Sequence, residues 1–233
     1  MPEGTVIVGA SLAGIRTASD LRKEGYDGSI TLIGDEPEKP YDRPPLSKGF
    51  LSGKDSAESI SLCSDSDISD QGIDLVLGTK VQSVDADRRI VTMDSGDSLN
   101  FDNLVAATGA GCIRPPWFRQ LAGVHELRTL ADAESLRKTL QDIDSLVVIG
   151  GGFVGTEVAA TARTLGISVT MVLREAHPLT TVLGSDVGAA VAALHEGHGV
   201  DVRPFSDVEA LLGEHSVAGV RLADGATIAA DAV

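Results

Sequence analysis

The chain has 233 residues, with 19 lysines and arginines against 34 aspartates and glutamates, so its formal net charge is −15. Binding to nucleic acid or to an anionic membrane surface depends on clustered Lys and Arg, so we expect neither as a partner. No apolar run is long enough to span a bilayer and the N-terminus lacks a signal-peptide pattern, which favours a cytoplasmic protein. The length allows one large domain or two ordinary ones. Many glycines and few aromatic residues are typical of an α/β protein.

A strand, a glycine turn and a helix occur twice in the sequence. Residues 5–8 form a β-branched run that ends at the turn 9–14, and apolar residues at helical spacing follow. Residues 145–149 lead in the same way into the turn 150–155 and an alanine-rich helix. The glycines keep one register: Gly9, Gly14 and Gly25 recur at a constant offset as Gly150, Gly155 and Gly166.

Each glycine of such a turn has its own task. The first makes the sharp passage from strand to helix, the middle one lets a pyrophosphate approach the backbone, and the third lets helix and strand pack closely. Free N–H groups and the positive end of the helix dipole then hold the anion. We therefore predict two dinucleotide sites. Their turn residues are Gly9, Ser11 and Gly14 in the first copy, where serine replaces the middle glycine, and Gly150, Gly152 and Gly155 in the second.

Further strands complete each copy. The first is followed by predicted strands at 29–33, 75–77, 80–81, 89–93 and 103–107, and the second by strands at 168–173, 200–203, 208–212, 217–222 and 227–228. The charged stretch 132–144 indicates a solvated amphipathic helix. The predicted fold is α/β, with two Rossmann-like domains that each contain a parallel sheet, helices and an inserted β-meander. A proline-rich segment at 113–117 places the boundary near residue 112, which gives domains 1–112 and 113–233.

Several motifs together carry a resemblance to a known family. They are Pro40-Tyr41-Asp42-Arg43-Pro44-Pro45-Leu46-Ser47-Lys48, Ala107-Thr108-Gly109, His125-Glu126-Leu127-Arg128-Thr129-Leu130 and Val148-Ile149-Gly150-Gly151-Gly152-Phe153-Val154-Gly155-Thr156-Glu157. The chain resembles, over its whole length, the flavoprotein ferredoxin reductases that serve bacterial oxygenases and cytochromes P450, within the pyridine nucleotide-disulfide oxidoreductase superfamily. Putidaredoxin, rubredoxin and biphenyl-dioxygenase ferredoxin reductases are of this type. The resemblance implies an enzyme that passes electrons from NAD(P)H through FAD to a ferredoxin or rubredoxin.

The resemblance also implies which residues bind FAD. Domain 1–112 would be the FAD-binding domain, with Gly9, Ser11 and Gly14 at the pyrophosphate and Asp35 or Glu36 near the adenosine ribose. Arg43 and Lys48 would approach the flavin and pyrophosphate, since cations offset phosphate charge and stabilise a reduced flavin. The remaining residues expected along the FAD cleft are Val81, Thr108, Gly109 and Arg128.

Two residues are expected to act next to the reacting rings. Lys48 by itself reads as a surface lysine at the start of a helix, and Glu157 as a carboxylate that complements the helix dipole. In the family that the chain resembles, a glutamate at the position of Glu157 lies near the nicotinamide and can pair with a lysine at the position of Lys48. We therefore name Lys48 and Glu157 as the candidate catalytic residues.

The choice of nicotinamide cofactor is left open by the sequence. An acidic residue that ends the second strand of the NAD(P)H unit binds the ribose 2′-OH, whereas an arginine there accommodates a 2′-phosphate. Leu173 occupies the position expected to be acidic and is followed by Arg174 and Glu175. Arg174 favours NADPH and Glu175 favours NADH, and we set NADPH slightly ahead.

Two other functions remain as alternatives: an NAD(P)H oxidase-like flavoprotein and a non-catalytic dinucleotide-binding module. The oxidase normally needs a redox cysteine after the first unit, and the two cysteines, Cys63 and Cys112, form no CxxC or CxxxxC pair. The five histidines show no metal-ligand pattern, so no metal is expected. The family resembled continues into a return segment and a C-terminal interface domain. We therefore expect a truncated form whose FAD domain is incomplete, which binds FAD weakly or not at all and can itself be inactive.

Overall fold

The computed structural model describes residues 4–233, which form two compact units. The first comprises the chain up to Arg43 together with Ala57–Gly111, and the second comprises Pro44–Ser56 together with Cys112–Val233. The sequence assigned all of 1–112 to one domain and did not foresee that Pro44–Ser56 groups with the second unit. Each unit is described by itself below.

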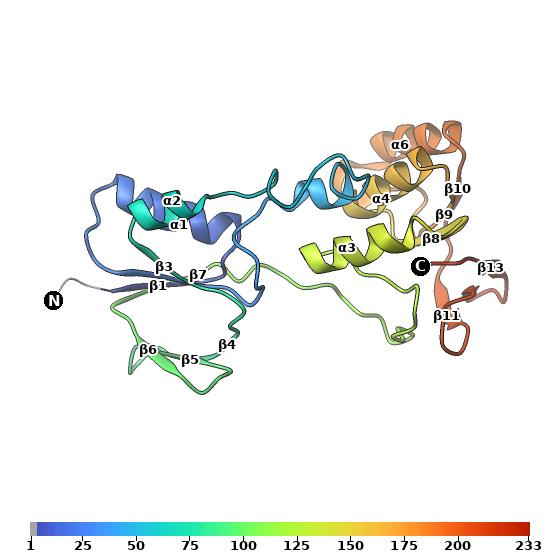
Figure 1. The fold of residues 1–233 in the computed structure, drawn as a ribbon. Coiled ribbons are helices and arrows are strands. Elements are labelled where there is room, and N and C mark those ends of the chain that lie inside the picture. The colour runs from blue at the N-terminus through green and yellow to red at the C-terminus, as the bar shows by residue number, and fades with distance from the viewer. Residues whose placement is uncertain (1–3) are drawn as a thin grey trace. The chain divides into compact units, whose positions relative to one another are not determined.

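The first unit is built on a four-stranded parallel sheet in the order β3-β2-β1-β7. Its strands are β1 (Thr5–Val8), β2 (Ile30–Ile33), β3 (Ile73–Val76) and β7 (Asn103–Ala106). Figure 1 shows α1 (Leu12–Lys23) and α2 (Asp65–Asp70) on one side of this sheet and an antiparallel sheet on the other. The antiparallel sheet consists of β4 (Val81–Asp85), β5 (Ile90–Met93) and β6 (Ser98–Asn100).

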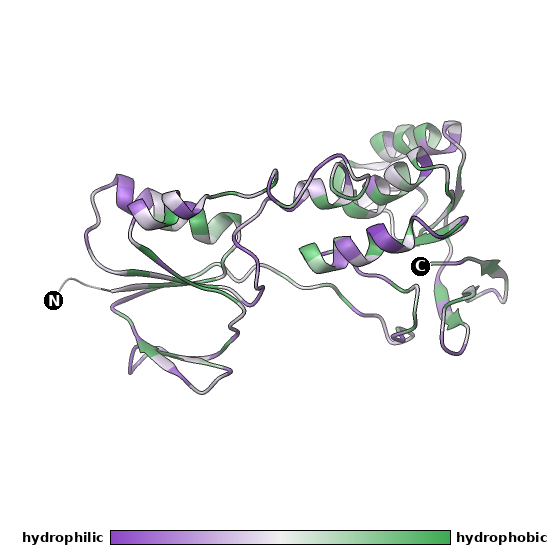
Figure 2. Ribbon diagram, in the orientation of Figure 1, coloured by the Kyte–Doolittle hydropathy of each residue, from purple (hydrophilic) through white to green (hydrophobic). Residues whose placement is uncertain are grey.

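The burial of β1 on both faces explains why its sequence is a continuous apolar run. Successive side chains of a strand point to opposite faces, and both faces of this sheet are covered. Ile7 packs in the core with Ile15 of α1, whereas its neighbour Val6 packs with Val91 and Met93 of the antiparallel sheet. Figure 2 shows hydrophobic residues along these strands.

The second unit repeats this plan. Its parallel sheet has the order β10-β9-β8, with β8 (Ser145–Ile149), β9 (Ser168–Val172) and β10 (Val200–Arg203). Ala232 forms a parallel bridge with Leu146 of β8, at the place that β7 takes beside β1 in the first unit. The antiparallel sheet contains β11 (Val208–Leu212), β12 (Gly219–Leu222) and β13 (Thr227–Ala229). The two predicted β-meanders and the duplicated parallel sheet are thus confirmed.

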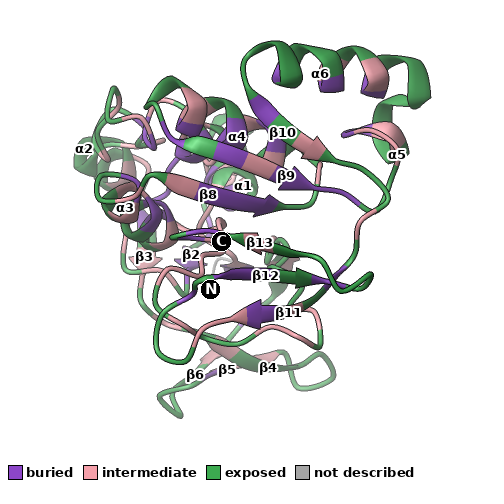
Figure 3. Ribbon diagram, turned by 90° about the vertical axis from the view of Figure 1, so that its right-hand side faces the viewer, coloured by how far each residue is buried: buried purple, intermediate pink, exposed green. Residues whose placement is uncertain are grey.

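The helices of the second unit are α3 (Leu130–Thr139), α4 (Phe153–Thr164), α5 (Thr180–Leu183) and α6 (Ser185–Gly197), with a short 3-10 helix at Pro44–Ser47. Leu146 and Val148 of β8 pack with Val158 of α4, whereas Val147 between them packs with Val220 of the antiparallel sheet. Figure 3 shows the middle of β8 buried and much of α6 exposed.

Some elements differ from those predicted. The helix expected over 132–144 instead spans Leu130–Thr139. It begins earlier because Thr129 caps it: the Thr129 side chain accepts from the backbone N–H of Asp132, whose carboxylate accepts in turn from the backbone N–H of Thr129. Helices α2, α5 and α6 were not predicted. In α6, most apolar residues are alanines and Gly188 interrupts them, which leaves no clear apolar stripe for sequence reasoning to detect. No helix within the described residues is long and apolar enough to cross a membrane.

Candidate functional site: two glycine turns and an adjoining pocket

The glycine turn of the second unit has an open surface at the start of α4. Gly150 adopts φ +101°, which a residue with a side chain rarely adopts, and this turns the chain from β8 into the helix. A Cβ on Gly155 would lie 2.3 Å from the carbonyl oxygen of Gly150, so only glycine allows this close packing. A Cβ on Gly152 would meet no atom within 4 Å. Gly152 therefore borders free space, where the middle glycine is expected to admit a pyrophosphate.

The N-terminus of α4 is also left without a side-chain partner. Gly152 is its N-cap and no acidic residue lies in its first turn, whereas α2 and α3 each carry a complete capping box. Helix α1 of the first unit resembles α4, since its N-cap Ser11 makes no side-chain capping bond and its first turn has no acid. Unsatisfied N–H groups at the positive end of a helix dipole attract an anion. The N-termini of α1 and α4, which follow the two predicted dinucleotide turns, are uncapped in this way, whereas those of α2 and α3 are not.

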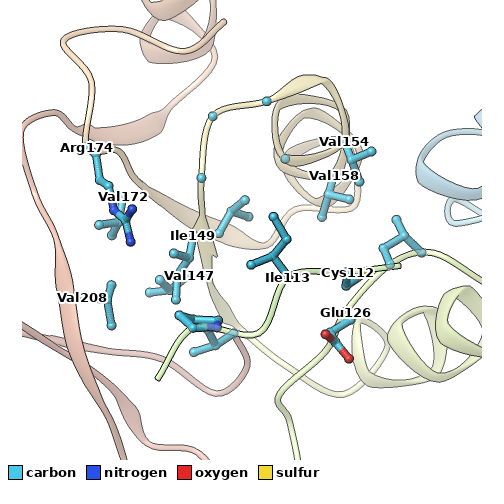
Figure 4. A pocket seen from close by; sticks show the side chains of 18 of the residues that line it. Cys112, Ile113, Glu126, Val147, Ile149, Val154, Val158, Val172, Arg174 and Val208 are labelled. Carbon is cyan, nitrogen blue, oxygen red and sulfur yellow. The ribbon is translucent and has the colours of Figure 1, made fainter. Parts of the chain in front are cut away.

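A pocket of about 810 Å³ adjoins this turn within the second unit. Its wall includes the glycine turn, the first residues of α4, the end of β9, the start of β11 and the segment that follows Cys112. Figure 4 shows Arg174 beside Val172 and Val208, away from Cys112 and Glu126. A pocket of this size with a mainly apolar wall and a few polar groups is typical of a small-molecule or cofactor site.

The position expected to bind the ribose is not available for that contact. Leu173 is fully buried and belongs to the core around β8 and α4. A Cβ on Gly151 would lie 2.5 Å from a methyl group of Leu173, which shows that this side chain fills the space under the turn. Arg174 and Glu175, in contrast, are exposed and line the pocket. Arg174 Nε donates to Oδ1 of Asp207 at 3.0 Å, so the guanidinium that favoured NADPH already has a carboxylate partner. The sequence did not single out Asp207.

The two candidate catalytic residues form an ion pair. Lys48 Nζ lies 2.6 Å from Oε2 of Glu157, and the same lysine donates to the carbonyl oxygen of Pro44. Ser47 Oγ also donates to Glu157 Oε2, at 2.5 Å. Thr161, one helical turn after Glu157, donates to the carbonyl oxygen of Ser47 at 2.8 Å. Sequence reasoning missed Ser47 and Thr161, since a serine and a threonine far apart in the chain give no joint signal.

The first unit brings together several of the predicted FAD residues. A Cβ on Gly14 would lie 1.9 Å from the carbonyl oxygen of Gly9, the same close approach as in the second turn. Arg43 Nη2 donates to Oε1 of Glu36 at 2.6 Å, and Arg43 Nε donates to Ser11 Oγ at 3.3 Å. Tyr41 also donates to Glu36 and lies beneath the guanidinium of Arg43. A cation is thus held at the first glycine turn, which fits a pyrophosphate.

The other residues predicted for FAD are more dispersed. Gly9 lies against the backbone of Ala107 and Thr108, so Thr108 is at the first turn and Gly109 follows it with φ +69°. Asp35 is exposed after β2, and Val81 begins β4. Lys48 and Arg128 belong to the second unit, where the backbone N–H of Arg128 donates to the carboxylate of Asp132 at the start of α3. These roles toward FAD stay predictions.

Two titratable groups that line the pocket, Cys112 and His125, have shifted pKa values. Burial raises the pKa of the Cys112 thiol, and the carboxylates of Glu126 and Asp132 raise it further, so this cysteine is not an activated thiolate. Burial lowers the pKa of His125. Its Nε2 atom is buried and lacks a hydrogen-bond partner among the residues that the structure describes. Both cysteines are free, and no group of possible metal ligands occurs within residues 4–233.

Comparisons with known proteins agree with this description. The chain is 40% identical over 230 residues to rhodocoxin reductase of Rhodococcus erythropolis, which covers 98% of this chain and 54% of that protein. It is 39% identical over 241 residues to putidaredoxin reductase of Pseudomonas putida, covering 99% of this chain and 56% of the relative. The chain therefore spans about half the length of these curated relatives.

Solved structures show the same fold. The crystal structure of a covalent putidaredoxin reductase–putidaredoxin complex matches with a TM-score of 0.95 at 38% sequence identity, covering 99% of this chain and 57% of that one. The family model described as pyridine nucleotide-disulphide oxidoreductase matches residues 4–233. With two glycine turns, two parallel sheets and this match over nearly its whole length, the chain belongs to the pyridine nucleotide-disulphide oxidoreductase family.

Proposed function

We propose that the chain provides the two dinucleotide-binding units of an FAD-dependent NAD(P)H:ferredoxin oxidoreductase. Electrons pass from NADH or NADPH through FAD to a ferredoxin or rubredoxin-type iron–sulfur protein that serves an oxygenase or cytochrome P450. The observation that carries this proposal is the pair of uncapped helix N-termini, each behind a glycine turn of the same geometry. Relatives named rhodocoxin reductase and putidaredoxin reductase support it. We place the reaction in the cytoplasm, where nicotinamide coenzymes are recycled.

The two units are proposed to take different dinucleotides. The first unit binds FAD, with Arg43 and the N-terminus of α1 at the pyrophosphate, and Glu36 holding Arg43 in place. The second unit binds NAD(P)H in the pocket at the N-terminus of α4, where Gly152 leaves room for the pyrophosphate. The apolar wall of this pocket shields the nicotinamide ring from water.

FAD, when bound, supplies the conversion of a two-electron hydride transfer into single-electron steps. The contribution of this chain is positioning. Glu157 and the carbonyl oxygen of Pro44 fix the ammonium group of Lys48, and Ser47 fixes Glu157. A cation that is held in this way stabilises negative charge without reorganisation during the reaction. The chain's own cysteines are free and take no part in the proposed reaction.

The first experiment is spectroscopic. We expect the purified chain, supplied with FAD, to show the absorption of a bound flavin that NADH or NADPH bleaches under anaerobic conditions. An added iron–sulfur ferredoxin is expected to restore the oxidised spectrum. Failure to bind FAD or any nicotinamide nucleotide would refute the proposal. Nucleotide binding without bleaching of the bound flavin would instead identify a non-catalytic module, and rapid reoxidation by oxygen with no effect of ferredoxin would identify an oxidase.

A pair of variants tests the role of Lys48. Lys48→Met is expected to slow bleaching by at least about tenfold, because it removes the cation that Glu157 holds. Lys54→Met is the matched control, since Lys54 is an exposed lysine of the same segment. Equal rates for the two variants would exclude Lys48 from the reaction.

A further inference from the structure

The pocket lacks the carboxylate that the second strand of an NAD(P)H unit is expected to supply. Leu173 occupies that position, and its side chain is fully buried in the core. A different residue must therefore decide whether the adenosine ribose can carry a 2′-phosphate. Residues that line the pocket next to Leu173 are the candidates.

Asp207 brings a carboxylate to this corner from another element. It lies in the loop between β10 and β11, lines the pocket, and accepts from Arg174 Nε at 3.0 Å. Both side chains are largely exposed, at 68% for Arg174 and 56% for Asp207, so a bound nucleotide can reach them. Arg174 follows the strand end at which the ribose is expected.

The loop that carries Asp207 is fixed to the end of β9. The backbone N–H of Ser206 donates to the carbonyl oxygen of Leu173 at 2.7 Å, and that of Phe205 donates to the carbonyl oxygen of Glu175. Phe205 adopts φ +51°, an unusual conformation for a bulky residue, which turns the chain back onto residues 173–175. Asp207 is thus presented at a defined place beside Arg174.

The charges around this corner oppose a further anion. Among the described residues that line the pocket, Arg174 is the one lysine or arginine, and two of the lining carboxylates lie next to it: Glu175 and Asp207. Asp207 already neutralises Arg174, and Glu175 follows Arg174 directly. A 2′-phosphate would have to displace Asp207 from Arg174 or lie close to a like charge, and either costs binding free energy.

We infer that Asp207 is the specificity-determining residue of this pocket, and that its ion pair with Arg174 selects the nucleotide without a 2′-phosphate, NADH. This inference rests on the proposed function of the second unit as the NAD(P)H site. It reverses the preference for NADPH that Arg174 by itself indicates. Asp207 rejects the 2′-phosphate by occupying the arginine that would bind it.

The test measures binding rather than turnover. Trp117 is the one tryptophan in the sequence and lines the pocket, so its fluorescence is expected to fall when a reduced nicotinamide binds nearby. Titrations of the whole chain with NADH and with NADPH give the ratio of the two dissociation constants. We expect the unaltered protein to bind NADH more tightly. Asp207→Asn is expected to strengthen NADPH binding by about two- to fivefold and to change NADH binding much less, because the exposed ion pair no longer holds Arg174 and the guanidinium is freed for the phosphate.

Further variants identify the cause of the change. The double variant Arg174→Gln/Asp207→Asn is expected to lose the gain in NADPH binding. Asp201→Asn is the matched control, because Asp201 pairs with Arg203 on β10 and neither residue lines the pocket. Tighter binding of NADPH by the unaltered protein, or an unchanged ratio in Asp207→Asn, would overturn the inference. If neither nucleotide binds to the unaltered protein, the proposed function fails and takes the inference with it.

Discussion

The two glycines at the start of α4, Gly152 and Gly155, have different surroundings, in line with the separate tasks that the glycine motif predicts for them. Gly155 packs against the carbonyl oxygen of Gly150, whereas Gly152 faces open space. Neither is in the left-handed region, since Gly152 has φ −74° and Gly155 is helical. The two positions therefore separate close packing in the fold from space for a ligand.

This contrast gives a prediction at the scale of single residues. Gly155→Ala is expected to lower the free energy of unfolding by about 1–3 kcal/mol, because its Cβ would overlap a backbone oxygen. Gly152→Ala is expected to leave stability nearly unchanged and to weaken nucleotide binding by at least about tenfold, because its Cβ would enter the space for the pyrophosphate. Thermal unfolding and Trp117 fluorescence titrations measure the two effects. Nucleotide binding unchanged in Gly152→Ala would place the pyrophosphate elsewhere.

At the scale of elements, one aspartate connects the segment after β13 to the start of β8. The carboxylate of Asp231 accepts from Ser145 Oγ at 2.7 Å and from the backbone N–H groups of Ser145 and Asp144. The hydrogen bond from the Ser145 side chain, with those from the backbone, holds the pKa of Asp231 below its usual value. These bonds fix Ala232 beside Leu146, where the parallel bridge forms.

The lowered pKa of Asp231 determines how its contribution to the free energy of unfolding depends on pH. A carboxyl with a lower pKa in the folded state adds stability above its unfolded pKa, and this stability is lost as the pH falls through the folded pKa. Asp231→Asn is therefore expected to cost about 1 kcal/mol at neutral pH, and the difference from the unaltered protein should shrink in acid. Urea unfolding of both proteins at several pH values measures this difference in stability. Asp142→Asn, at an exposed position after α3, is the control, and a difference that stays constant down to acid pH would contradict the explanation.

At the scale of the whole molecule, the segment Pro44–Ser56 carries the end of the motif at residues 40–48 and belongs to the second unit. Leu51 is 1% exposed and belongs to the core formed by β8, β9 and α4. Ser47 and Lys48 contact Glu157, and Thr161 contacts Ser47. Phe50 lies against the guanidinium of Arg137 of α3. Lys48 is thus carried by the unit that is proposed to bind NAD(P)H.

This assignment predicts which unit a mutation in the segment destabilises. Leu51→Ala is expected to cost about 2–5 kcal/mol, since it leaves a cavity in the core of the second unit. Trp117 packs against the other core of that unit and reports its unfolding by fluorescence. The Trp117 transition should move to lower denaturant in Leu51→Ala and stay in place in Lys54→Ala, whose side chain is exposed. An unmoved transition in Leu51→Ala would mean that the segment does not stabilise the second unit.

The sequence by itself determined the duplicated architecture. Glycine turns, β-branched runs and helical periodicity are local signals, and they are set by backbone sterics and by which faces are buried. The matching φ values of Gly9 and Gly150, +115° and +101°, show how closely the two copies follow one local rule. The family also followed from local motifs, because residues 40–48 and 148–157 keep their spacing.

The tertiary structure alone decided which side chains act together. No local rule places Asp207 on Arg174, Ser47 on Glu157 or Leu51 in the core of the second unit. The sequence already shows leucine at position 173, where an acid is expected, but only the structure shows that this side chain is buried under Gly151. Contacts between residues far apart in sequence depend on how the layers fold back on one another. The duplicated glycine-turn units therefore follow from local sequence, whereas the ion pair that we propose to select the nucleotide depends on packing between distant residues.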